Sequence, residues 1–116
     1  MPDRVPVTVD DLALARAALD ATRGVAGVAD ISRGRYALAR TFGLRGEMVE
    51  GVQFTASTQG LVVEIHLVVR LVPIPPLACA VREAVSAALT TLGTSVTAVD
   101  IWVDALQLTE RDEARL

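Results

Sequence analysis

The chain has 116 residues, which is the length of a single domain. Hydrophobic residues make up 52% but aromatic residues only 3%, so the core must consist of valine, alanine and leucine. The net charge of −3 argues against a dedicated nucleic-acid-binding protein, which usually carries a basic surface. A single cysteine and a single histidine argue against a disulfide framework and a Cys- or His-rich metal site. The absence of lysine excludes a Schiff-base enzyme and a P-loop, and we expect no cofactor.

The first regular element predicted is an amphipathic helix over residues 9–22. Thr8 and Asp11 stand at the spacing of a capping box, and Gly24 ends the helix. Its predicted buried stripe follows helical spacing and consists of Leu12, Ala15, Ala18, Leu19 and Thr22.

The next fifty residues predict short strands joined by turns. Residues 25–31 are apolar and bounded by glycine, which indicates a strand, whereas residues 35–42 form a strand or an ordered loop. Residues 43–51 contain three glycines and are predicted to be a loop. Residues 52–57 alternate as a strand does, and Gln59-Gly60 makes the following turn.

The clearest strand covers residues 61–72, because apolar side chains recur at every second position. One face holds Val63, Ile65, Leu67, Val69 and Leu71; the other holds Val62, Glu64, His66, Val68, Arg70 and Val72. Pro73 ends this strand and Pro75-Pro76 opens a second helix, which Gly93 closes. The stripe of this helix is Leu77, Val81, Ala84, Val85, Ala88 and Leu92.

The last predicted strand covers residues 96–105. Val99, Ile101 and Val103 lie on one face of it, and Asp100, Trp102 and Asp104 lie on the other. A charged tail begins at Thr109 and either frays or forms a short helix.

These elements predict an α+β domain. Two amphipathic helices pack on one face of a small mixed β-sheet, in the order α-β-(β)-β-β-α-β. The strand–helix–strand unit over 61–105 makes its two strands parallel. We expect an N-terminal arm at 1–7, one domain at 8–106 and a charged tail at 107–116.

Several residues are candidates for chemistry, each with a simpler structural explanation. His66 and Arg70 are expected to face Asp100 and Asp104, where opposite charges on neighbouring strands stabilise a sheet. Together with Glu64 these carboxylates are candidates for acid–base or metal chemistry, but no spacing matches a metal-binding loop. Cys79 lies near the start of the second helix, where it is either a reactive thiol or a small residue beneath a partner.

A second candidate function is a small nucleic-acid-binding module. Gly24 to Gly27 has the GxxG form of the loop with which KH domains clamp RNA, although its centre is Val-Ala. The arginines within residues 33–45 follow it and form a locally basic stretch: Arg33, Arg35, Arg40 and Arg45. A turn between helix and strand also explains both glycines.

The second face of the predicted sheet carries more apolar side chains than solvent exposure requires, which is typical of a protein–protein site. We predict an interface made of Val62, His66, Val68, Arg70, Val72, Asp100, Trp102 and Asp104. The alternative is that residues 33–50 cover this face.

Most of residues 8–106 resembles the bacterial alkaline shock protein family, also called envelope stress response proteins. The resemblance rests on VEIHLVVRLVPIPPLACAVREAVSAALTTLG followed by VTAVDIWVDAL, and upstream on LARAALDATRGVAGVADIS. Residues 33–50 depart from the family pattern. The resemblance implies a non-enzymatic protein that associates with itself and provides no catalytic residue to carry over. It also implies docking at the inner face of the cytoplasmic membrane through a small membrane-anchoring protein.

The expected location is therefore cytoplasmic, peripheral to the membrane and without direct insertion. No signal peptide is evident at the N-terminus, and the apolar stretch over 71–81 is interrupted by prolines and too short to span a bilayer. One free thiol is consistent with a reducing compartment.

Overall fold

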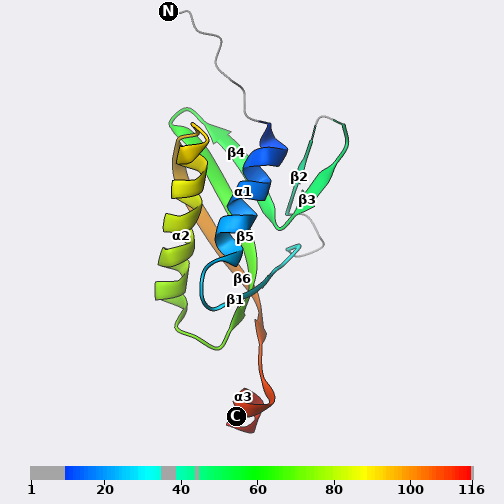
Figure 1. Ribbon diagram of the computed structural model, residues 1–116, viewed down its shortest axis with the longest axis vertical. Coiled ribbons are helices and arrows are strands. Elements are labelled where there is room, and N and C mark those ends of the chain that lie inside the picture. Colours follow the sequence, from blue (N-terminus) through cyan, green and yellow to red (C-terminus); the bar gives the residue numbers. More distant parts are fainter. Residues whose placement is uncertain (1–9, 35–38, 44, 116) are drawn as a thin grey trace, which may run out of the picture.

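The computed structural model describes residues 10–34, 39–43 and 45–115 (Figure 1). The predicted arm at 1–7 lies outside these ranges. In chain order the elements are α1 (Asp11–Arg23), β1 (Val28–Ile31), β2 (Arg40–Phe42), β3 (Met48–Glu50), β4 (Val52–Ser57), β5 (Gly60–Arg70), α2 (Ile74–Thr91), β6 (Val96–Gln107) and α3 (Glu110–Ala114). The predicted α+β class is confirmed, with α1 and α2 side by side over the main sheet (Figure 1).

The main sheet is organised around β5. β6 pairs with it in parallel from Leu61 to Arg70, so β6 occupies one whole edge of β5. β4 and β1 both pair with β5 in antiparallel fashion, β4 with its first half and β1 with its second. They therefore share the other edge end to end. The parallel pairing of the strands on either side of α2 confirms the predicted crossover.

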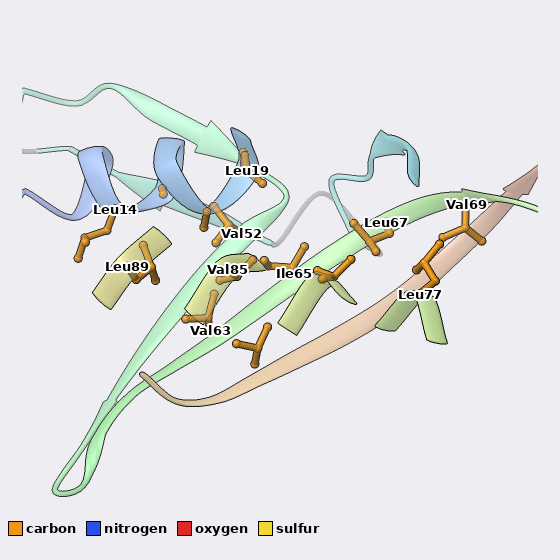
Figure 2. Close-up of a cluster of buried hydrophobic side chains, with 14 residues drawn as sticks. Leu14, Leu19, Val52, Val63, Ile65, Leu67, Val69, Leu77, Val85 and Leu89 are labelled. Carbon is orange, nitrogen blue, oxygen red and sulfur yellow. The ribbon is translucent and has the colours of Figure 1, made fainter. Parts of the chain in front are cut away.

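The core lies between this sheet and the two helices (Figure 2). Alternation along β5 sends Val63, Ile65, Leu67 and Val69 toward the helices, and all four are fully buried. Leu14 and Leu19 of α1 and Leu77, Val81, Val85 and Leu89 of α2 complete the cluster. Both predicted helical stripes therefore face the sheet, except that Leu92 is exposed and Leu89 takes the buried position at the end of α2.

The position of α2 follows from its two ends. Pro73 is the N-cap and a proline stands in the first turn, where the missing N–H costs no helical hydrogen bond. Gly27 lies against this end of the helix, since a Cβ there would be 2.7 Å from Leu77 Cδ1 and 3.0 Å from Val72 Cγ2. Farther along, Arg82 Nε donates a hydrogen bond of 3.1 Å to the carbonyl of Val99 on β6.

The first helix begins two residues later than predicted. Its N-cap is Asp10, whose side chain accepts a hydrogen bond of 3.3 Å from Leu12 N, and Thr8 lies outside the described residues. Aspartate is among the residues most strongly preferred at the N-cap, which explains why the helix begins directly after Asp10.

The predicted loop at residues 43–51 is wrong, because β3 lies within it. β2 and β3 form a two-stranded antiparallel hairpin in which Thr41 faces Val49. Thr41 Oγ1 donates a hydrogen bond of 2.8 Å to the carbonyl of Val52, and Gly51 N donates one of 2.7 Å to Ala39 O. β3 was not recognised in the sequence because a glycine lies close to each of its ends. Gly46 makes the hairpin turn, and Gly51, at φ 95°, joins β3 to β4.

The C-terminal ends of β5 and β6 also differ from the prediction. β5 ends at Arg70, so Leu71 is not a core residue and is 51% exposed. β6 continues to Gln107, two residues beyond the predicted end. The tail forms the short helix α3, held by a capping box between Thr109 and Asp112, and buries none of its residues. Of the helices in the described part of the chain, none has the length and hydropathy needed to cross a membrane.

Candidate functional site

The candidate site lies on the outer face of the sheet, which is the face turned away from α1 and α2. Because alternate β5 side chains enter the core, Glu64 and His66 project from the opposite face. Their register partners on β6 are Asp100 and Trp102. Two neighbouring strands therefore place a histidine, a tryptophan and two carboxylates on one surface.

His66 is buried, with only 10% of its side chain exposed, and both of its ring nitrogens contact carboxylates. Nε2 lies 2.7 Å from Glu64 Oε2, and Nδ1 lies 2.9 Å from Asp104 Oδ2. An ionised carboxylate can only accept hydrogen bonds, so with both acids ionised each ring nitrogen must donate. The geometry therefore suits an imidazolium, whose two N–H groups each find a carboxylate acceptor.

A β-bulge brings Asp104 to the histidine. Leu67 pairs with Val103, but the next residue of β5, Val68, pairs with Ala105. Asp104 is the additional residue on β6, and a bulge of this kind redirects a side chain. The expected approach of His66 to Asp104 is thus confirmed. The expected pairing of Arg70 with an aspartate is wrong, because its register partner is Gln107.

Trp102 stacks on the histidine ring. The ring centroids are 5.6 Å apart and the ring planes differ by 10°. Trp102 is nevertheless 53% exposed, so one side of the indole remains available. The stack connects the charged group of the site to its largest exposed apolar side chain.

A groove of about 720 Å³ adjoins these residues, lined by Ser32, Gly34, Ala39, Gln53, Glu64, His66, Trp102, Val103 and Asp104. It includes a serine, a histidine and an aspartate, but the nitrogen that a catalytic histidine would turn to the serine is bonded to Glu64. Ser32 Oγ instead accepts a hydrogen bond of 3.2 Å from Gly34 N. The geometry does not make a nucleophile of Ser32.

The segment after β1 covers part of this face, which was the alternative left open by the sequence. Ser32 N donates a hydrogen bond of 2.9 Å to His66 O. A Cβ on Gly34 would lie 3.2 Å from the His66 ring and 3.1 Å from Ala39 Cβ. Among the described residues, this cover contacts His66, while Trp102 is 53% exposed.

The other residues of the predicted interface differ in exposure. Val62 and Val68 are half-buried on the outer face. Val72, 36% exposed, lies beyond the end of β5, and Arg70 is exposed. Exposed apolar groups also follow the edge strand β6, where Trp102, Val103 and Leu106 are 53%, 38% and 51% exposed. Trp102 lies on the outer face, whereas Val103 and Leu106 pair with Leu67 and Val69, which face the helices. We call these three residues along the strand the β6 surface.

The GxxG turn is lined by apolar groups. Val25 and Ala26 border a shallow groove with Val72, Pro73, Pro76, Leu77 and Ala80, and no arginine is among its lining residues. Arg33 is 3.7 Å from Glu50, and Arg40 lies over the Phe42 ring at 5.4 Å from its centroid. Arg35 is outside the described residues. Gly27 is explained by its contact with α2.

The remaining candidates carry no arrangement that suggests chemistry. Cys79 is exposed on α2, and its nearest polar partner is Glu83 Oε1 at 4.0 Å. No group of three metal-ligating side chains converges within residues 10–34, 39–43 and 45–115. The acids that flank His66 approach different ring nitrogens.

Comparison with known proteins concerns the fold alone. No family model matches the chain, and no curated protein matches it. Among solved structures, one variant of the protein named MamM CTD has a TM-score of 0.50 at 13% identity, covering 88% of this chain and 96% of that one. A zinc form has a TM-score of 0.48 at 15% identity, covering 82% and 85% of the two chains. A manganese form has a TM-score of 0.48 at 16% identity, covering 82% and 98%.

Proposed function

We propose that this protein acts by association, as a non-enzymatic scaffold of the alkaline shock type. It associates with itself through the β6 surface and docks on a small membrane-anchoring protein at the inner face of the cytoplasmic membrane. The observation that carries the proposal is an exposed tryptophan with two exposed aliphatic neighbours on an unpaired edge strand.

The edge of β6 is the first support. β5 is the only strand that pairs with β6 among the described residues, over a strand of twelve residues. An unpaired edge presents free backbone N–H and C=O groups, which proteins usually cover, shorten or charge. Here Arg82 covers one carbonyl, that of Val99, near the start of the strand. The rest of the β6 edge, which carries the β6 surface, is therefore suited to pairing with another chain.

The composition of the β6 surface is the second support. Tryptophan is enriched among the residues that contribute most to binding free energy. Asp100 and Asp104 stand on either side of Trp102 on the same strand, so an apolar anchor is bordered by charges that favour one register over another. This is the anatomy of an association surface.

Membrane docking is the finer part of the proposal, and its support is the resemblance of residues 8–106 to the alkaline shock family. That resemblance covers both helices and the β5–α2–β6 unit. It assigns the membrane contact to a partner protein.

The nucleic-acid alternative receives no support from the geometry. The GxxG turn contacts apolar residues of α2, and Arg33 is engaged by Glu50. A KH-type clamp needs that turn to approach a phosphate backbone.

Photo-crosslinking in the native host tests the proposal. The full chain would carry a photoreactive amino acid at position 103 in the β6 surface or, as a control, at position 42 on the β2–β3 hairpin. Phe42 is an equally exposed apolar residue, at 55%. We expect position 103, and not position 42, to crosslink to a second copy and to a small membrane-spanning protein. Equal crosslinking at both positions, or recovery of nucleic acid at either, would contradict the proposal.

A further inference from the structure

We propose that the protonation of His66 controls the position of Trp102, and that association through the β6 surface weakens as the histidine loses its proton. This inference rests on the proposed function, because it adds a pH-dependent switch to the same surface. His66 and Trp102 are the only histidine and the only tryptophan of the chain.

The first step is the hydrogen bonding of the ring. Glu64 Oε2 and Asp104 Oδ2 lie 2.7 Å and 2.9 Å from the two ring nitrogens. A neutral imidazole has one N–H and one lone pair, so it can donate to only one carboxylate. The other carboxylate then faces a lone pair at hydrogen-bond distance, which is repulsive. Loss of the proton therefore forces one carboxylate to move.

The second step is that Asp104 connects the ring to the strand that carries Trp102. It is the additional residue of the β6 bulge and its side chain is 24% exposed, whereas Glu64 belongs to β5 and is 35% exposed. Trp102 precedes this bulge by two residues and stacks on the ring itself. A displacement of Asp104 and the loss of the imidazolium charge both act on the indole.

The third step is the charge of the surroundings. Within the described residues, β5 contributes Glu64 and β6 contributes Asp100 and Asp104. Gln53 of β4 is neutral, and the segment after β1 contributes Arg33, whose guanidinium lies 3.7 Å from Glu50. The imidazolium is thus bonded to two carboxylates, Glu64 and Asp104, and Asp100 is the register partner of Glu64 on β6. Its loss makes the surface beside Trp102 more negative, which opposes the approach of a second identical surface.

Emission from the single tryptophan tests the switch in dilute, monomeric full-length protein. Protonation changes the charge of a histidine side chain, and we expect the emission to change across the same pH interval as the histidine ring resonances in NMR. Nitrogen chemical shifts of the ring should show both nitrogens protonated on the acidic side. An emission curve that stays flat while the histidine titrates would overturn the switch, and so would a single neutral tautomer throughout the interval.

Two variants separate the switch from general effects. In His66→Gln the emission change should disappear. In Asp104→Asn, which alters only a partly exposed side chain, the change should shrink several-fold, because an amide can either donate to or accept from the ring. An undiminished change in Asp104→Asn would overturn the role of the bulge even if the His66 variant failed to fold.

Sedimentation then connects the switch to association. We expect the dissociation constant of the wild-type assembly to rise about fivefold or more across the same interval, as for typical couplings between sites. An unchanged constant would overturn the link between His66 and the β6 surface. Failure to associate at any pH would overturn the proposed function, whereas the emission experiment would still decide whether the switch exists.

Discussion

The two faces of β5 differ in what they require from the sequence. On the inner face, Val63, Ile65 and Leu67 are fully buried against the helices, and only apolar shape is needed. On the outer face, Glu64 and His66 form a hydrogen-bonded cluster with Asp104, and Trp102 extends from it into solvent. One strand thus serves the core with alternate residues and a candidate interaction site with the others.

The outer face is itself divided. On the side of β1 and β4, the segment from Ser32 to Gly34 closes over His66. On the side of β6, no described strand follows, and Trp102 is half exposed. Within the described residues, the outer face is therefore covered at His66 and exposed at Trp102.

The largest effect should come from truncating the inner face. Leu67→Ala should lower the free energy of unfolding by about 2–5 kcal/mol, because the substitution leaves a cavity between β5 and the helices. Its neighbour Val68, half-buried on the outer face, is the matched control and should cost less than about 1.5 kcal/mol when changed to alanine. Urea denaturation measures both. Equal losses would contradict the division of the two faces.

Gly27→Ala should have the next largest effect, about 1–3 kcal/mol of unfolding free energy. Gly27 has φ 95° and its Cα faces Leu77 and Val72, so a methyl group adds a collision to backbone strain. Gly93→Ala is the control, because φ is 84° there but a Cβ would meet nothing within 4 Å. If the two variants lost equal stability, the contact with α2 would not explain Gly27.

Arg82→Met should cost about 0.5–1.5 kcal/mol, the usual contribution of one hydrogen bond. The variant keeps the apolar stem and removes only the donor to the Val99 carbonyl. It also lengthens the unpaired edge of β6, so self-association measured by sedimentation should not weaken. Weaker association would show that Arg82 belongs to the interface and does not protect the edge.

The smallest effect concerns α3. Hydrogen bonds from the backbone N–H and side chain of Thr109, followed by the charge of Arg115, hold the pKa of the Asp112 carboxyl below its ordinary value of 3.8. Because the folded-state pKa is lowered, the stabilisation of α3 is present above pH 3.8 and is lost as pH falls through the folded value. Thr109→Ala keeps the backbone N–H and removes the side chain, so it should return the Asp112 pKa part of the way toward 3.8, as followed by NMR of the carboxyl carbon. An unchanged pKa would contradict the contribution of the Thr109 side chain.

Much of the fold was predictable because its signals are periodic. The alternation over 52–57 matches β4, and the stripes of both helices identify the buried faces apart from the last turn of α2. β2 lies within the possible strand at 35–42, but β3 was missed because a strand of three residues is too short to show alternation between Gly46 and Gly51. Short strands of this kind are determined by tertiary hydrogen bonds such as that of Thr41.

The candidate site was predictable only in part. The alternation placed His66 and Trp102 on one face. The two bulges in the β5–β6 pairing then shift the register of the two strands, and no local sequence pattern predicts these bulges. That shift is why His66 meets Asp104 while Arg70 meets Gln107. The contact of Glu64 with His66 had a usable signal, since residues two apart on a strand share a face. The contact of Ser32 and Gly34 with His66 depends on the path of the chain after β1, and the amino-acid composition does not predict that path.

The most direct test of the account is sedimentation equilibrium of the wild-type chain beside Trp102→Ala and Phe42→Ala. Both aromatic residues are a little over half exposed, at 53% and 55%, so both variants should retain their fold. We expect the wild type and Phe42→Ala to associate equally, and Trp102→Ala to associate at least about tenfold more weakly, since truncation of a tryptophan anchor costs 2 kcal/mol or more. Equal association of all three proteins would contradict the assignment of the β6 surface.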